Sequence, residues 1–140
     1  MTATVLDASV IAAWLVPSQG TTSSDAFRMQ VVEARFLAPY IFPAECRSLL
    51  LRAERRGGLS PAEVVAALDF VARLAITVGP LLDRARHDDV LALARQEGLS
   101  LYDALYLDAA LASGARLASR DGPMLAVAAR RGLATVDLRD

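Results

Sequence analysis

Short apolar runs alternate with longer segments of helical period along the chain, and this alternation strongly constrains the fold. Each apolar run has the length of a buried strand, and each longer segment can cover one face of a sheet. Strands that alternate with helices in this way form a parallel sheet with helices packed on it. The pattern therefore predicts an α/β fold, a three-layer α/β/α sandwich around a central parallel sheet of about five strands.

The element boundaries follow from these periods and from the glycine and proline residues between them. Strands are expected over residues 3–6, 35–38, 75–78, 116–119 and 134–136. Helices are expected over residues 10–16, 22–34, 42–56, 61–74, 81–96, 101–112 and 124–130. Glycines that follow helical segments predict left-handed C-caps at Gly57, Gly98, Gly114 and Gly132. With 140 residues and no repeat or linker, the chain is expected to be a single domain over 1–140.

Absent residue types exclude several chemistries. All 15 basic residues are arginine, so a Walker A loop and a lysine nucleophile are excluded. One cysteine, Cys46, excludes an internal disulfide and is expected to be a buried, inert thiol. His87, the single histidine, lies in a polar run expected to be a solvated helix face. A Cys/His zinc site is therefore not easily built, and carboxylates and arginines remain as the reactive groups.

The chain is also expected to be cytoplasmic and to make no membrane contact. Residues 5–16 are apolar, but they lack a basic start and include Asp7. No apolar run reaches the length of about 18 residues that a membrane span requires. A net charge of -1 gives no bulk attraction to nucleic acid, so such binding would depend on local patches.

Four acidic residues lie where the predicted strands end or the predicted helices begin. They are Asp7, Glu45, Asp103 and Asp121. Each also has an ordinary explanation as a helix cap, a helix-start acid or a turn residue. Taken together, however, these positions are expected to meet at the carboxyl edge of a parallel sheet, where ligands bind.

Converging carboxylates repel one another unless a cation lies among them. Oxygen ligands without histidine or thiolate favour Mg²⁺, with Mn²⁺ as a possible substitute. Such an ion activates water and neutralises charge on a phosphodiester. Hydrolysis of a nucleic-acid backbone is therefore the chemistry that these residues indicate.

The chain resembles the PIN-domain ribonucleases, in particular the VapC toxins of bacterial type II toxin-antitoxin systems. The resemblance is carried by the segments TVLDASVIAAWL, APYIFPAECRSLLLRAERRG, GLSLYDALYLDAALASGARLASRDGPML and AARRGLATVDL. Asp7 matches the acid after the first strand, Glu45 the glutamate after the proline turn, and Asp103 the acid of the YDA motif. Asp121 matches the acid of a Thr-x-Asp motif, in which Ser119 replaces threonine.

This resemblance implies a Mg²⁺-dependent endoribonuclease that cleaves structured RNA, such as a tRNA or rRNA loop, and so inhibits translation as a toxin. The four acids would be catalytic and would bind the metal, and Ser9 and Ser119 would support them. Asp108 is a further acid near Asp103, expected on a solvated face or at the rim of the cluster. Candidate RNA contacts are Arg47, Arg52 and Arg120, with Arg55, Arg56 and Arg116 as further candidates.

The resemblance also implies a homodimer and a cognate VapB-type antitoxin. The predicted 42–56 helix has apolar residues over a wide arc, which favours a partner surface, although a helix packed on two sides has the same pattern. Trp14, Leu15 and Phe27 are candidates for the same surface. Two alternatives stay open. One is a non-catalytic PIN-fold module that binds RNA or protein. The other is a haloacid-dehalogenase-like Mg²⁺ phosphatase, which would want an aspartate where Ser9 stands.

Overall fold

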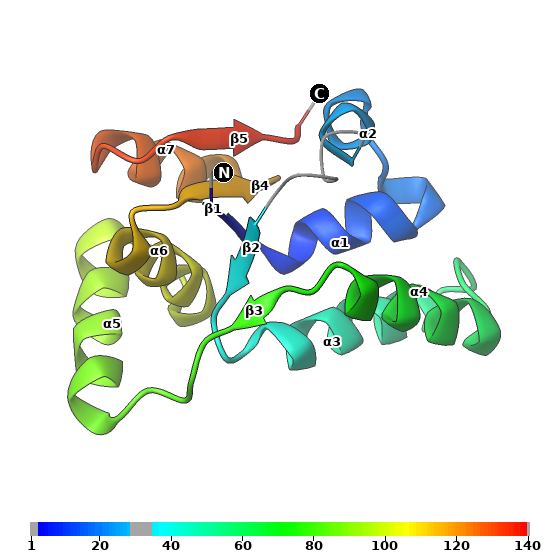
Figure 1. Cartoon of the computed structure of the whole chain (residues 1–140), viewed down its shortest axis with the longest axis horizontal. Helices are drawn as coiled ribbons and strands as arrows, with labels where there is room; N and C mark the ends of the chain where they lie inside the picture. The colour runs from blue at the N-terminus through cyan, green and yellow to red at the C-terminus, as the bar shows by residue number, and fades with distance from the viewer. Residues whose placement is uncertain (1–2, 29–34, 140) are drawn as a thin grey trace.

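The structure, a computed structural model, describes residues 3–28 and 35–139. Its centre is a parallel sheet of five strands, as predicted, and the strand order is β3-β2-β1-β4-β5 (Figure 1). The strands are β1 (Ala3–Leu6), β2 (Arg35–Ala38), β3 (Thr77–Val78), β4 (Arg116–Ser119) and β5 (Thr135–Asp137). The predicted bounds of β1, β2 and β4 are confirmed. β3 starts two residues late because Ala75 adopts a left-handed φ of 51° at the end of the preceding helix.

Seven α-helices and one 3₁₀ turn lie within the described residues. They are α1 (Ala8–Leu15), η1 (Pro17–Gln19), α2 (Thr22–Arg28), α3 (Phe42–Arg55), α4 (Pro61–Arg73), α5 (Arg84–Glu97), α6 (Leu101–Ser113) and α7 (Gly122–Arg130). The final part of the predicted 22–34 helix, residues 29–34, lies outside the described residues. α1 and α7 each begin two residues earlier than predicted, because Asp7 and Asp121 occupy their N-cap positions. α5 begins three residues later, where the Asp83 side chain accepts a hydrogen bond from the Arg86 amide.

Helices cover both faces of the sheet, which gives the predicted three layers. α6 contacts β1, β2 and β4, and α5 packs on α6. α1 contacts α2 and α3, and α3 in turn contacts α4, while α7 packs on β4 and β5. In Figure 1 the α5–α6 pair and the α1–α3–α4 group lie on opposite sides of the view. No helix in the described part of the chain is long and apolar enough to cross a membrane.

The strand order reverses between β1 and β4. The chain passes from β1 to β2 on one side, whereas β4 pairs with β1 on the other side. The Asp7 amide donates to the Ala118 carbonyl at 3.1 Å, so the pairing continues just past the end of β1. Ligands of open α/β sheets bind at the carboxyl ends of strands at such a switch point. The fold therefore places Asp7 and the residues after β4 where a site is expected.

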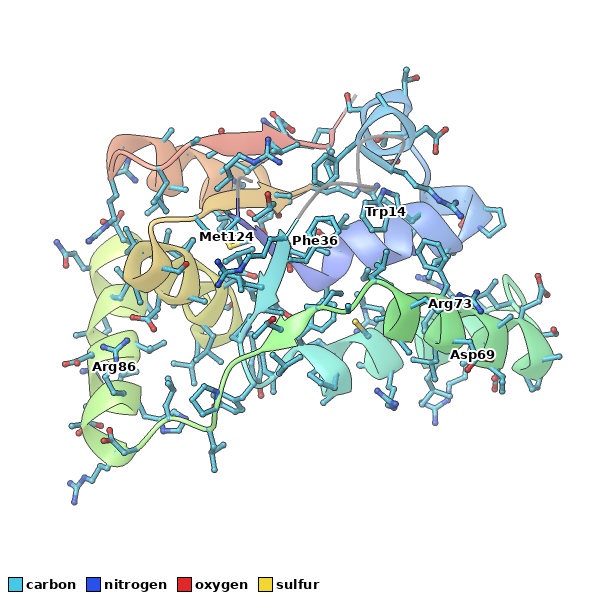
Figure 2. The ribbon with its side chains drawn as sticks, in the orientation of Figure 1. Trp14, Phe36, Asp69, Arg73, Arg86 and Met124 are labelled. Carbon is cyan, nitrogen blue, oxygen red and sulfur yellow. The ribbon has the colours of Figure 1, made fainter. Side chains whose placement is uncertain are left out.

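An aromatic cluster joins α1 to the sheet. The Trp14 ring lies 5.8 Å from Phe27, 6.5 Å from Phe36 and 6.4 Å from Phe70, measured between centroids. Figure 2 shows Trp14 beside Phe36 in the interior. Trp14 is 7% exposed and Phe27 3%, and Leu15 is half-buried. The assignment of Trp14 and Phe27 to a partner surface is therefore wrong, because their rings fill the core.

α4 begins with a capping box. The Ser60 hydroxyl accepts from the Glu63 amide at 3.1 Å, and the Glu63 carboxylate accepts from the Ser60 amide at 3.0 Å. We expect Ser60→Ala to lower the free energy of unfolding by about 1 kcal/mol, because it leaves a helix-start amide without its partner. Urea unfolding measures this difference. Ser113→Ala, at the far end of another helix, is the matched control, and an equal loss in both variants would contradict the capping role.

Candidate functional site

A cavity of about 460 Å³ opens at the carboxyl edge of the sheet. All four acids singled out in the sequence line it, and each comes from a different place in the fold. Asp7 follows β1, Glu45 and Asp103 lie in the first turns of α3 and α6, and Asp121 precedes α7. The full lining is Asp7, Ala8, Ser9, Thr21, Glu45, Leu49, Asp103, Arg120, Asp121 and Arg139.

Asp7 occupies the N-cap position of α1, but its side chain makes no capping bond. Its Oδ2 atom instead accepts hydrogen bonds from the Ser9 hydroxyl at 2.8 Å and the Ser119 hydroxyl at 2.7 Å. The side chain is only 7% exposed. Burial raises the pKa of Asp7, the two serine hydroxyls oppose this rise, and the nearby charge of Asp121 adds to it. The carboxylate is thus held in one orientation at the base of the cavity.

Ser119 connects Asp7 to Asp121. Its buried hydroxyl donates to Asp7 and accepts from the Asp121 amide at 2.9 Å. Asp121 then caps α7, because its Oδ1 accepts from the Met124 amide at 3.0 Å. The ordinary capping role expected for Asp121 is therefore present in the structure. Of the two carboxylate oxygens of Asp121, Oδ1 is therefore the one that accepts from a helix amide.

Glu45 reaches the cavity from the first turn of α3, after the proline turn. Burial raises its pKa, and the charge of Asp7 adds to this rise, while the Tyr106 hydroxyl acts in the opposite direction. Within the described residues, neither Glu45 Oε1 nor the Tyr106 hydroxyl has a hydrogen-bond partner of acceptable geometry, although both atoms are buried. An unsatisfied buried carboxylate oxygen is costly, which makes Glu45 Oε1 a candidate ligand atom.

Asp103 lies in the first turn of α6, where its amide donates to the Ser100 hydroxyl at 3.1 Å. Burial raises the pKa of its carboxyl to about 6, and the charges of Asp121, Asp7 and Glu45 contribute to this rise. Like charges raise the pKa of a carboxyl group only when they are close. The four acids therefore share one electrostatic environment.

The acids line one cavity, but they do not form a closed ion cage. No group of three His, Cys, Asp or Glu side chains among residues 3–28 and 35–139 is arranged to hold a metal ion as it stands. Two carboxylates are drawn to partners within the protein, Asp7 to serine hydroxyls and Asp121 to a helix amide. Their mutual repulsion also favours separation. The sequence predicted that the four acids lie at one place in the fold. It did not predict that their carboxylates stay too far apart to enclose an ion.

The predicted arginine contacts divide into two groups. Arg120 lines the cavity, and its amide donates to the Ser9 hydroxyl at 3.3 Å. Arg47 lies elsewhere, because its guanidinium donates to the Pro43 carbonyl and lines a separate apolar pocket between α3 and α4. Arg52 is exposed about two helical turns beyond Glu45 and does not line the cavity. Arg139 does line the cavity, and sequence reasoning missed it.

A family comparison decides the identity of the fold. The model of the PIN domain family matches residues 4–136. The chain belongs to the PIN domain family. Among curated proteins, no sequence matches the chain significantly.

Solved structures resemble this PIN domain over almost their whole length. PAE2754 from Pyrobaculum aerophilum is 23% identical with a TM-score of 0.73, covering 96% of this chain and 90% of that chain. FitAcB from Neisseria gonorrhoeae is 18% identical with a TM-score of 0.62, covering 96% of both chains. VapBC2 from Rickettsia felis, bound to a DNA fragment from their promoter, is 13% identical with a TM-score of 0.65, covering 97% and 98%. The TM-scores show that these three structures share the fold of this chain.

Two side chains of the PIN domain outside the cavity differ from expectation. The polar run around His87 is largely exposed, as predicted, but His87 itself is half-buried and its Nε2 lies 2.7 Å from the Tyr40 hydroxyl. Asp108 forms a two-pronged ion pair with Arg86, 2.7 Å to each carboxylate oxygen, and is 19% exposed. It therefore belongs to the α5–α6 contact and not to the rim of the cavity. Cys46 is buried as predicted, and burial raises its pKa to about 12.

Proposed function

We propose that this PIN domain is a metal-dependent endoribonuclease and the toxin of a toxin-antitoxin pair. One observation carries the proposal: four carboxylates from four separate parts of the fold line one cavity at the switch point of the sheet. An enzyme that hydrolyses phosphodiester bonds needs groups that neutralise the charge developing on the phosphate and that activate water. A carboxylate cavity provides the ligands for an ion with these properties.

The residues of the cavity suit Mg²⁺, or Mn²⁺ in its place. The candidate ligands Asp7, Glu45, Asp103 and Asp121 offer only oxygen atoms, which these hard cations prefer. The partnerless Oε1 of Glu45 is a buried oxygen that would gain a partner. An ion bound here would supply Lewis-acid activation of water and neutralise charge on the phosphodiester. Side-chain rotation would be needed to bring the separated carboxylates inward.

The remaining roles belong to side chains that hold the acids or face the substrate. Ser9 and Ser119 fix the Asp7 carboxylate, and Ser119 also holds the backbone after β4. Arg120 places a cation at the cavity and is the predicted arginine whose position suits a phosphate contact. Arg47 and Arg52 could contact only parts of an RNA that extend beyond the cavity.

The proposed substrate is structured RNA, such as a tRNA or rRNA loop, whose cleavage would inhibit translation. Sequence-specific proteins mostly recognise the single-stranded loops of structured RNA, because the unstacked bases of a loop are accessible to side chains. The resemblance of the YDA segment and its neighbours to VapC toxins supports this choice. The likeness to VapBC2 supports a VapB-type antitoxin partner. A homodimer and a cytoplasmic location are parts of the same proposal.

The partner surface must be smaller on α3 than the sequence suggested. Phe42, Cys46, Leu50 and Ala53 are buried within the domain, and Leu51 is 40% exposed. The wide apolar arc arises because α3 packs on both α1 and α4. Exposed apolar residues also occur at Val65 and Tyr102, 60% and 55% exposed.

RNA cleavage tests the proposal. Purified protein is incubated with total bacterial RNA in Mg²⁺ or in EDTA, and new 5′ ends are mapped by sequencing. Discrete cuts that require Mg²⁺ are expected. The competing function is a non-catalytic PIN-fold module, which the lack of a ready ion group in the described residues favours. If the RNA stays intact and the folded protein binds neither Mg²⁺ nor Mn²⁺, the result would support the non-catalytic module. Membership of the PIN family sets the phosphatase alternative aside.

Ser119 offers a test of how the acids are held. We expect Ser119→Ala to weaken Mg²⁺ binding about tenfold, because Asp7 loses a hydroxyl partner at 2.7 Å and the Asp121 amide loses its acceptor. Isothermal titration measures the affinity. Ser119→Thr keeps the hydroxyl and restores the residue usual in the resembling family, so it should bind Mg²⁺ as the native chain does. Unchanged affinity in Ser119→Ala would refute the positioning role.

A further inference from the structure

Arg139 follows β5 and is held in place along its backbone. The Leu138 amide donates to the Ser119 carbonyl at 3.0 Å, which continues the pairing with β4. The Thr21 hydroxyl donates to the Leu138 carbonyl at 2.6 Å. Figure 1 shows the end of β5 beside α2, in agreement with this contact. The chain therefore cannot carry Arg139 away from the cavity without breaking bonds to β4 and to the start of α2.

The Arg139 side chain is also oriented. Its Nε and Nη2 atoms donate to the Asp137 carboxylate at 3.0 and 2.7 Å. This two-pronged pair fixes the plane of the guanidinium. A guanidinium has five N–H donors, so Asp137 leaves part of its donor set available. Arg139 is half-exposed, and among the described residues its Nη1 atom has no hydrogen-bond partner.

Gly122 makes room for this guanidinium. A Cβ atom built at Gly122 would collide with Nη1 of Arg139 and come within 3.1 Å of its Cζ. Gly122 follows Asp121 directly, so the guanidinium lies against the backbone next to one of the four acids. The charge of Asp121 helps to raise the pKa of Arg139, after the larger effects of Asp137. Because Gly122 has no side chain, the Arg139 guanidinium can lie beside Asp121 in the lining of the cavity.

Electrostatics at the cavity call for such a cation. Four acids line it, and a polyanionic RNA strand would be repelled by them wherever an ion does not intervene. Arg120 and Arg139 are the two cationic side chains among the lining residues. Arg120 uses one guanidinium nitrogen on the Gln19 side chain at 3.4 Å. In Arg139, Asp137 occupies the Nε–Nη2 edge and fixes the plane of the guanidinium, which leaves the Nη1 donors in a defined position for a phosphate oxygen.

We propose that Arg139 binds a backbone phosphate of the RNA next to the cleaved bond, and that Asp137 and Gly122 position it there. The proposal rests on the nuclease function and assigns that function a substrate-binding residue. An exposed Arg–Asp pair is usually only a weak ion pair on the surface. That role does not explain two features of Arg139. The guanidinium fits against Gly122, and it lines the same cavity as the acids.

The test measures RNA binding without cleavage. Each substitution is made in the full chain carrying Asp103→Asn, and binding of a fluorescent single-stranded RNA of about ten nucleotides is followed over a range of salt concentrations. We expect Arg139→Gln to weaken binding about tenfold and to reduce the slope of log K against log salt by about 0.7, the value for one phosphate contact. Arg84→Gln, which also removes one charge but lies 96% exposed on α5, should leave both quantities nearly unchanged.

The Gly122→Ala variant tests whether RNA binding depends on the position of the Arg139 guanidinium or only on the net charge of the protein. The atoms that the new methyl group meets belong to the flexible end of Arg139, so the protein should fold while the guanidinium is displaced. We expect this variant to weaken binding in the same direction as Arg139→Gln, although its net charge is unchanged. In the active protein, Arg139→Gln should raise KM for RNA cleavage more than it lowers kcat, at unchanged cut positions. Circular dichroism confirms folding of each variant.

The outcomes distinguish this inference from the nuclease function. If the native chain cuts RNA in Mg²⁺ and Arg139→Gln binds RNA with the same affinity and salt slope, the Arg139 assignment is overturned while the nuclease stands. Equal weakening by Arg84→Gln would also overturn it, because the effect would then be one of net charge. If the native chain neither cuts nor binds RNA, both proposals fall together.

Discussion

Replacing Asp103 by asparagine is expected to reduce RNA cleavage about 1000-fold or more while the protein stays folded. Asparagine has nearly the shape of aspartate, and the Ser100 bond uses the backbone amide of residue 103, which the substitution keeps. The carboxylate charge is lost from the cavity that it shares with Asp7, Glu45 and Asp121. A loss of this size corresponds to about 4 kcal/mol of transition-state stabilisation, which is reasonable for a ligand of a catalytic ion.

The measurement compares initial rates of cleavage at mapped sites for the native chain and the variant at the same Mg²⁺ concentration. Asp69→Asn is the matched control, because Asp69 is an exposed acid on α4 and does not line the cavity (Figure 2). It should cleave as the native chain does. Native rates in Asp103→Asn would show that the four acids are not the catalytic group, even if RNA cleavage itself were real.

The general location of the site could be predicted because it depends on local patterns. Asp7 and Asp121 directly follow or nearly follow apolar runs, and parallel strands bring the ends of such runs to one edge. Glu45 and Asp103 lie at helix starts marked by Pro43 and Ser100. Periodicity and capping residues are visible in the sequence, so the strands and the acids could be assigned from them.

The missed features depend on contacts between residues far apart in the chain. Asp108 meets Arg86, and His87 meets Tyr40, only because α5 packs against α6 and the turn after β2. Sequence reasoning missed Arg139 because its place depends on the bond from Thr21 to Leu138 and on the missing side chain of Gly122. The hydrophobic periodicity of a single segment contains no information about such long-range contacts. One weak signal was present, because a glycine immediately after a site acid often indicates close approach of another group.

The charge of Asp103 is also expected to destabilise the fold in the absence of metal. Its pKa is about 6 in the folded protein and 3.8 in the unfolded reference, so the folded state holds the proton more tightly. The resulting stability is fully present below about pH 4 and is lost as the pH rises through about 6. Two pKa units correspond to about 3 kcal/mol, and solvent at this half-buried group should reduce the effect to about 2 kcal/mol.

Comparison with Asp103→Asn isolates this contribution from those of Glu97 and Asp137, whose arginine partners lower their pKa values. At pH 4 the carboxyl group of Asp103 is largely protonated, so the native chain and the variant should have nearly equal free energies of unfolding in urea. At pH 7 in EDTA the variant should be more stable by about 2 kcal/mol. Equal stability at both values would show that Asp103 is well solvated and only weakly coupled to the other acids.

Magnesium should narrow this difference in stability at pH 7, because the ion and the proton compete for the same carboxylates. At pH 7 and a Mg²⁺ concentration ten times the dissociation constant, the native chain should gain about 1.4 kcal/mol, and at pH 4 almost nothing. Asp103→Asn should lose most of the gain at pH 7. This result requires no knowledge of the RNA target, so it tests the metal site independently of cleavage. A gain that is the same at both pH values, or the same in the variant, would place any bound Mg²⁺ away from Asp103.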